Sequence, residues 1–281
     1  MRVLSQLKQQ LQKLADPKRA QSSLWFFKTG PGEYGEGDKF LGVGVISLRK
    51  LAKQYKDLSL LNVLLLLKSP WHEYRQIALL ILMLKYKKGD SKIKTQVFNA
   101  YIKNTQYINN WDLVDITAPR IVGNHLVDKS RQLLYNFARS QDLWKKRIAI
   151  ISTFAFIKNN DFTDALKLAE ILLNDQHDLI HKAVGWMLRE VGNRDRATEE
   201  QFLKKYYKLM PRTMLRYAIE KFPEQKRKFY MSKVHHPRLP SPAAQDQWRA
   251  GLAPPQRGGE AISISPPARG GVRGGGRGVG I

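Results

Sequence analysis

A helical spacing of apolar residues, at i, i+3, i+4 and i+7, constrains the fold of this chain more than any other feature. The spacing runs through almost the whole of residues 1–231, where strand-like alternation of apolar and polar residues is scarce. A stripe with this period turns one face of a helix toward a core. The sequence therefore predicts an all-α fold for this part of the chain.

Individual helices can be placed from the stripes and from their end signals. The first helix is expected over Val3–Leu14, and Asp16-Pro17 should start the next, because Asp caps a helix well and Pro suits its first position. Gly30–Asp38 is expected to form a loop. Further helices are expected over Leu48–Tyr55, Leu58–Leu67, Trp71–Tyr86, Ile93–Ile102, Trp111–Leu126, Lys129–Ala138, Leu143–Ile157, Ala165–Leu173, Ile180–Val191, Glu199–Leu209 and Pro211–Phe222.

The expected helices follow one another through short polar connections such as Lys88-Gly89-Asp90. Taken in pairs they give a structural period of roughly 35–40 residues, which is typical of HEAT and armadillo repeats. We therefore expect a HEAT-like helical-repeat solenoid with a concave face.

The charge of the chain points to a polyanionic partner. The formal net charge is +24, from 48 Lys+Arg against 24 Asp+Glu, which favours nucleic acid or an anionic membrane surface. The richest apolar runs, Leu58–Leu67 and Ile77–Leu84, are shorter than the ~20 residues that span a bilayer. Met1–Ala15 has no apolar segment of the signal-peptide type. A cytoplasmic, nucleoid-associated protein is expected if the source is prokaryotic, and a basic concave face would suit duplex DNA.

Composition changes sharply near Ser232. Residues 233–281 hold 10 of the 20 glycines and 7 of the 13 prolines, and carry +5 of the net charge. We expect two parts, a helical domain over 1–231 and a disordered Gly/Pro/Arg-rich tail over 232–281. Ala268–Gly278 resembles an RGG segment, which can bind single-stranded nucleic acid. A solvated tail without a dedicated role, or a fused or frame-shifted end, would have the same composition.

One candidate site lies on the helix expected over Trp111–Leu126. Trp111 and Asp115 are four residues apart and share a face, at the border of an apolar stripe formed by Val114, Ala118 and Ile121. A carboxylate there is partly desolvated and requires a cation or a hydrogen-bond donor. It is therefore a candidate catalytic group, although a carboxylate that merely pairs with a neighbouring Lys or Arg would fit the pattern as well.

Other candidates carry positive charge or imidazole. Arg147 flanks the apolar stripe of its helix, beside Lys145 and Lys146, and is either a phosphate ligand or part of a solvated helix end. Arg212 and Arg216 share a face and suit phosphate contacts, unless Arg216 pairs with Glu220. His177 and His181 have the i, i+4 spacing of zinc ligands, but helix capping and packing explain them without a metal, and no Cys is present.

Residues 1–231 resemble the AlkD-like family of DNA alkylation-repair glycosylases. The resemblance rests on several separate segments that match in order: Trp71–Arg75, Asn109–Asp115, Trp144–Ile150, His177–Glu190 and Met210–Ala218. The tail matches nothing in that family. The resemblance implies HEAT-like repeats around a concave basic DNA cleft, and excision of N3- and N7-alkylated purines from duplex DNA.

The resemblance also implies roles for individual residues. Asp115 takes the place of the catalytic carboxylate, with Trp111 and Trp186 as the aromatic residues of the site and Arg147 as its basic residue. Gly44 departs from relatives that carry a polar side chain near this position, so a DNA contact there is in doubt. Candidate DNA-binding residues are Arg147, Lys145, Lys146, Lys182, Arg189, Arg212 and Arg216.

Such an enzyme would need no metal, no cofactor and no obligate protein partner, and the resemblance suggests a monomer. A non-catalytic HEAT-repeat protein that binds DNA or RNA would use the same basic face. A helical-repeat scaffold for acidic proteins is a third interpretation of this composition.

Overall fold

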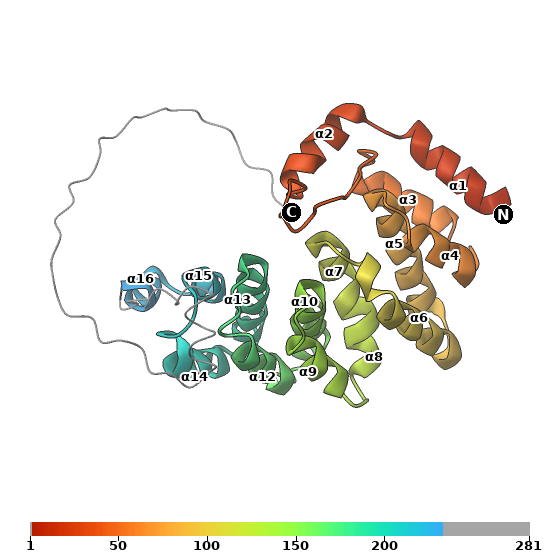
Figure 1. Cartoon of the computed structure of the whole chain (residues 1–281). Coiled ribbons are helices and arrows are strands. Elements are labelled where there is room, and N and C mark those ends of the chain that lie inside the picture. Colours follow the sequence, from red (N-terminus) through yellow and green to blue (C-terminus); the bar gives the residue numbers. More distant parts are fainter. Residues whose placement is uncertain (1, 233–281) are drawn as a thin grey trace, which may run out of the picture. The chain divides into compact units, whose positions relative to one another are not determined.

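A computed structural model describes residues 2–232, so the expectations for the tail, its disorder and its RGG segment, lie outside the described residues. Within residues 2–232 the chain is helical and has no strand (Figure 1). A single parallel bridge joins Lys39 to Trp71 in this part of the chain. The helices are α1 (Arg2–Lys13), α2 (Pro17–Phe26), α3 (Val45–Gln54), α4 (Leu60–Leu67), α5 (His72–Lys88), α6 (Ser91–Lys103), α7 (Trp111–Ala118), α8 (Asn124–Leu126), α9 (Gln132–Ala138), α10 (Leu143–Ser152), α11 (Phe154–Lys158), α12 (Thr163–Ile171), α13 (Asp178–Gly192), α14 (Arg196–Tyr206), α15 (Arg212–Ala218) and α16 (Glu224–Ser232).

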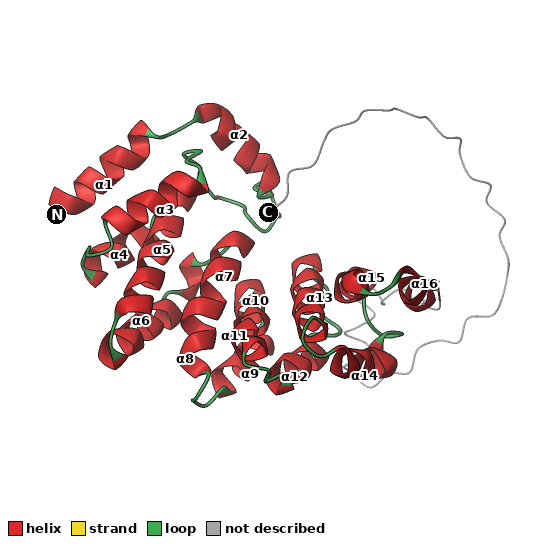
Figure 2. Cartoon of the chain, turned by 180° about the vertical axis from the view of Figure 1, so that it is seen from behind, coloured by secondary structure: helices red, strands yellow, loops and turns green. Residues whose placement is uncertain are grey.

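The helices pack in two layers that follow the chain. In the first layer α5, α7, α10, α13 and α15 lie side by side, each in contact with the next. In the second layer α6 packs on α5, α9 on α10, and α12 and α14 on α13 (Figure 2). The expected all-α helical-repeat fold is confirmed, while its assignment to the HEAT class remains a prediction.

Most predicted helices are present with ends shifted by a few residues. Asp16 caps α2 as expected, accepting bonds from the backbone nitrogens of Lys18 at 3.0 Å and Arg19 at 3.2 Å. The helix predicted over 143–157 divides at Thr153 into α10 and α11, and α16 was not predicted. No charged residue interrupts the apolar run around Thr153, so nothing in the pattern marked that division.

The helix predicted over 111–126 continues through a proline. A π-helical turn, Pro119–Gly123, connects α7 to α8. Pro has no N–H to donate and its ring crowds the carbonyl four residues earlier, so the regular turns of α7 end here, and the wider turn that follows carries the chain into α8. The predicted stripe is buried along this length, with Val114, Ala118 and Ile121 fully inaccessible. The continuous stripe therefore fixes one face of α7 in the core and leaves Asp115 at its edge.

Close contact between α13 and α15 depends on Gly185. A Cβ at this position would lie 2.4 Å from the carbonyl oxygen of Met214, which is closer than such atoms approach one another. Any larger residue would push the two helices apart, and α13 also carries Trp186, the second predicted aromatic residue of the site.

A buried carboxyl between α13 and α14 makes the stability of the fold depend on pH between about 4.5 and 8. Glu199 is 1% exposed, and burial raises its pKa to about 8. The folded state therefore holds a proton that the unfolded chain releases near pH 4.5, and stability falls as the pH rises from there toward 8. We expect Glu199→Gln to remove a loss of roughly 1.4 kcal/mol per pH unit across this interval. Urea unfolding at pH 5, 7 and 9 measures the free energy of unfolding of the wild type and of Glu199→Gln. The same pH dependence in the two proteins would contradict the prediction.

No helix within residues 2–232 is both long enough and apolar enough to cross a bilayer.

Candidate functional site

The N-terminus of α7 is fixed by a buried asparagine. Asn110 is fully inaccessible, and its side-chain oxygen accepts a bond of 2.8 Å from the backbone nitrogen of Trp111. The cap fixes the start of α7, and Trp111 and Asp115 then share one face of the helix, as their spacing predicts.

Asp115 and Arg147 form a bidentate ion pair between α7 and α10. Arg147 donates from Nε to Oδ1 at 2.8 Å and from its Nη2 to Oδ2 at 2.7 Å. A further donor of the same guanidinium bonds the carbonyl oxygen of Leu179, in the first turn of α13. The side chain of Arg147 is only 6% exposed, so it is no part of a solvated helix end. Because the fork geometry matches a carboxylate, the pair holds Asp115 in one orientation.

Two opposing effects act on the Asp115 carboxyl, whose side chain is 17% exposed. Burial raises its pKa, and the charge and hydrogen bonds of Arg147 lower it, with burial the larger effect. The charge of Asp112 adds to the rise. The net result is a pKa above the ordinary value, and Arg147 is the group that favours the ionised carboxylate.

Asp115 and Trp186 line one pocket of about 290 Å³, together with Phe154 of α11 and the cations Arg120 and Lys158. The indole N–H of Trp186 donates to Glu190 at 3.0 Å, one turn further along α13. The ring centroid of Phe154 lies 6.1 Å from that of Trp186. This hydrogen bond orients the indole beside the pocket that also exposes the carboxylate, and its charged lining suits a polar ligand.

Trp111 lies against aromatic residues that the sequence did not single out. Its ring is 5.8 Å from Phe26 and 5.6 Å from Phe27, at the end of α2. Tyr34, in the loop after α2, has its ring 5.9 Å from Trp144 of α10 and 6.5 Å from His177. Aromatic residues within a Gly/Pro-rich segment were the available signal, but only the fold shows that this loop reaches the N-terminal ends of α7, α10 and α13.

A buried charge cluster anchors this loop to α5 and α7. His72 of α5 is 2% exposed, with its Nε2 2.9 Å from Asp112 and its Nδ1 3.4 Å from Asp38. Arg75 donates to Asp38 at 2.7 Å. Burial lowers the pKa of His72, but the two carboxylates outweigh it and raise the pKa to about 9. The imidazole is therefore charged near neutral pH and links the loop to the helix that carries Asp115.

Glu73 holds the next part of the same loop. Its carboxylate accepts backbone N–H bonds from Leu41 at 2.9 Å, Gly42 at 2.7 Å and Val43 at 3.2 Å. Gly42 has φ +80, and a Cβ there would lie 2.1 Å from the carbonyl oxygen of Asp16, so only glycine fits. The segment Trp71–Arg75, noted in the sequence only for its resemblance, thus contributes the residues that hold the loop.

The space beside Gly44 is occupied by another side chain. A Cβ at Gly44 would lie 2.3 Å from a terminal nitrogen of Arg19, an exposed residue of α2. The guanidinium of Arg19 therefore fills the space that a side chain at position 44 would take.

The other predicted basic residues differ in whether a carboxylate already pairs with them. Lys146 lies 2.6 Å from Asp175, Lys182 lies 2.6 Å from Asp178, and Arg189 pairs with Glu220. Arg216 does not pair with Glu220. Within residues 2–232, Lys145, Arg212 and Arg216 have no carboxylate partner at ion-pair distance and are free for phosphate contacts.

His177 acts as a helix cap. Its Nδ1 accepts a bond of 3.1 Å from the backbone nitrogen of Leu179, and His181 bonds the carbonyl oxygen of Asp175. No group of three or more candidate metal ligands is found in residues 2–232.

The fold and the site together define a basic helical-repeat protein with a paired carboxylate beside an aromatic pocket. Over residues 7–222 the chain matches the family model described as DNA alkylation repair enzyme. Because this match covers most of the chain, the chain belongs to the DNA alkylation repair enzyme family, and alkylation repair of DNA is its role.

Comparison with solved structures agrees on the fold. A protein from Enterococcus faecalis, described as a predicted DNA alkylation repair enzyme, superposes with a TM-score of 0.60 at 15% identity. The superposition covers 75% of this chain and 97% of that one. At this identity the likeness concerns the fold alone. Comparison with curated protein sequences gives no match.

Proposed function

We propose that the chain is a DNA glycosylase that hydrolyses the N-glycosidic bond of cationic alkylated purines, of the 3-methyladenine and 7-methylguanine type, in duplex DNA. The observation that carries the proposal is the carboxylate of Asp115, partly exposed, fixed bidentately by Arg147 and lining the same pocket as Trp186. A fixed negative charge beside an aromatic wall suits a reaction that develops positive charge.

The chemistry of the lesion explains why one carboxylate suffices. A purine alkylated at N3 or N7 is cationic, so it leaves as a neutral base without an acid to protonate it. The difficult species is the oxocarbenium-like sugar that remains. Asp115 stabilises this cation and orients a water for attack on the sugar carbon, accepting its proton. A preorganised group of this kind contributes roughly 2.7–4 kcal/mol of barrier lowering.

The neighbours of Asp115 serve this role. Trp186 lines the pocket of Asp115 and can attract a cationic base or sugar there. Trp111 does not line that pocket, and its proposed contact is with the DNA beside it, where it packs on Phe26 and Phe27. Arg147 was predicted as a phosphate ligand. Arg147 also orients Asp115, because three of its donors are already engaged within the protein. A phosphate would have to compete with these bonds.

Duplex DNA containing alkylated purines is the proposed partner of a monomer that needs no metal and no cofactor. Lys145, Arg212 and Arg216 are proposed as phosphate contacts because they are free of carboxylates. Lys146, Lys182 and Arg189 would exchange a carboxylate for a phosphate. A cytoplasmic, nucleoid-associated location is proposed if the source is prokaryotic.

Activity should fall on the acid side as Asp115 takes up a proton. Because its pKa is raised, the midpoint of this fall is expected above the 3.8 of an unperturbed aspartate. Single-turnover release of 7-methylguanine at saturating enzyme, measured across acid pH, gives the midpoint. DNA binding followed by anisotropy over the same range serves as control. A midpoint at or below the ordinary value would contradict the burial argument.

The test of the proposal is release of free base from methylated duplex DNA. Chromatography of the released bases distinguishes 3-methyladenine from 7-methylguanine. If the wild-type protein releases neither, the enzyme proposal is wrong, and a non-catalytic nucleic-acid-binding protein of the same fold takes its place.

A further inference from the structure

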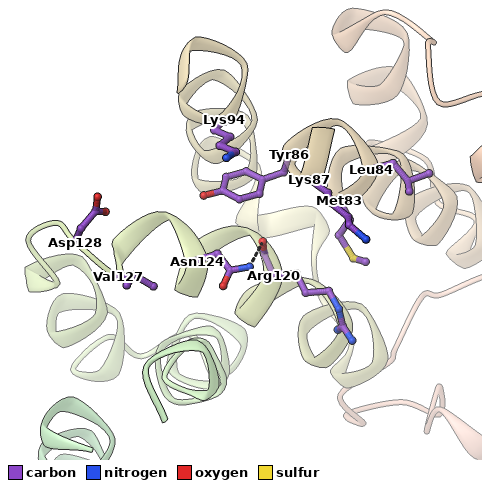
Figure 3. A pocket seen from close by; sticks show the side chains of 9 residues that line it. All are labelled: Met83, Leu84, Tyr86, Lys87, Lys94, Arg120, Asn124, Val127 and Asp128. Carbon is purple, nitrogen blue, oxygen red and sulfur yellow. Dashed lines mark hydrogen bonds between the residues drawn. The ribbon is translucent and has the colours of Figure 1, made fainter. Parts of the chain in front are cut away.

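A second pocket adjoins the pocket that contains Asp115. It measures about 840 Å³ and lies between the end of α5, the start of α6 and the turn from Pro119 into α8 (Figure 3). Arg120 and Asn124 line both pockets and form the wall between them, with the side chain of Asn124 bonded to the carbonyl oxygen of Arg120 at 3.2 Å. We call this second pocket the side groove.

The polar lining of the side groove is mainly cationic. Lys87, Lys94 and Arg120 line it against one carboxylate, Asp128. Within residues 2–232 none of these three cations has a carboxylate at ion-pair distance, whereas Lys146, Lys182 and Arg189 elsewhere are paired. Cations that line a concave surface without a carboxylate partner favour an anionic ligand.

The remaining lining of the side groove places aromatic rings beside these cations. The ammonium of Lys94 lies 6.0 Å from the centroid of the Tyr86 ring, so a cation and an aromatic face stand together (Figure 3). On the other side of Arg120, Lys158 lies over the ring of Phe154 at 4.6 Å, in the pocket of Asp115. Positive groups beside aromatic faces therefore continue from the carboxylate into the side groove.

We infer that the side groove binds the sugar–phosphate backbone of the DNA strand that flanks the lesion, on one side only. This inference rests on the proposed function, because the lesion sets the register at Asp115. Phosphates along one strand are regularly spaced, so a strand that leaves Asp115 past Arg120 would enter the part of the side groove that Lys87 and Lys94 line. These contacts position the DNA and carry no sequence information.

The test replaces the two lysines of the side groove together, Lys87→Ala with Lys94→Ala. A matched control replaces Lys167 of α12 and Lys204 of α14 by Ala, two exposed lysines that line neither the side groove nor the pocket of Asp115. The probe is a fluorescent duplex with one central tetrahydrofuran abasic-site analogue. The slope of log K against log[salt] should decrease in magnitude by about 0.9 for each phosphate that the protein no longer neutralises, up to about 1.8 for the pair. The control should change it far less.

Shortening the probe on one side of the analogue tests the direction. The wild-type protein should lose affinity when the flank over the side groove is removed, and the groove variant should not; removal of the opposite flank should weaken both equally. The inference is overturned if the groove variant has the same salt-dependence slope as the Lys167 and Lys204 control. It is also overturned if the groove variant responds to both truncations as the wild type does. Base release by saturating enzyme tests the proposed function separately: its absence from wild type, with the flank effect intact, would defeat only the glycosylase assignment.

Discussion

Replacement of Asp115 by Asn is expected to slow single-turnover base release from methylated duplex DNA by roughly 10²–10³-fold. The carboxamide keeps the shape of the side chain but supplies no negative charge for the sugar cation and no base for the water. Affinity for duplex containing the abasic-site analogue should change little, because the phosphate contacts remain. Saturating enzyme separates the chemical step from binding, and chromatography quantifies the released base.

A matched control for this result is Asp57→Asn, which removes one negative charge from a residue between α3 and α4, away from Asp115. It should leave base release unchanged. If Asp115→Asn releases base as fast as this control, Asp115 is not the catalytic group. A non-catalytic nucleic-acid binder would show steep salt dependence and no effect of Asp115 on any measurement. A scaffold for acidic proteins would bind acidic peptides that DNA fails to displace.

The periodicity of the sequence predicted the helices because each stripe is a local property of its own segment. It also placed Asp115 correctly, at the border of the stripe that buries Val114 and Ala118. Helix ends were less predictable where they depend on the backbone and not on the apolar pattern. A π turn follows Pro119 and continues that helix, and another helix divides at Thr153 without a change in the apolar pattern.

The partner of Asp115 depended on packing between helices far apart in the sequence. The sequence left open whether Asp115 pairs with a neighbouring Lys or Arg, and whether Arg147 binds a phosphate. The structure joins these two questions, because α7 lies against α10 and the two residues pair with each other. The same holds for His72 with Asp38 and Asp112, more than thirty residues away on either side. No local pattern encodes such pairs, although buried charges demand partners.

The ion pair also predicts a large effect on stability. Arg147→Met should lower the free energy of unfolding by about 3–5 kcal/mol near neutral pH, because Asp115 then remains largely buried without its cation. The pKa of Asp115 should rise further, since Arg147 is the group that lowers it, and the stability loss should shrink at acid pH where the carboxyl takes up a proton. Urea unfolding at neutral and acid pH measures both effects.

A double-mutant cycle distinguishes loss of the pair from loss of packing. Asp115→Asn combined with Arg147→Met removes both charges, so the double variant should recover much of the stability lost by Arg147→Met alone. If Arg147 acted mainly through its packing or through its bond to Leu179, the double variant would be as unstable as the single one or less stable. Base release should be lost in Asp115→Asn and in the double variant, because both lack the carboxylate. A double variant that is stable but inactive would show that folding does not require the ion pair. The Asp115 carboxylate would then be required for the reaction alone.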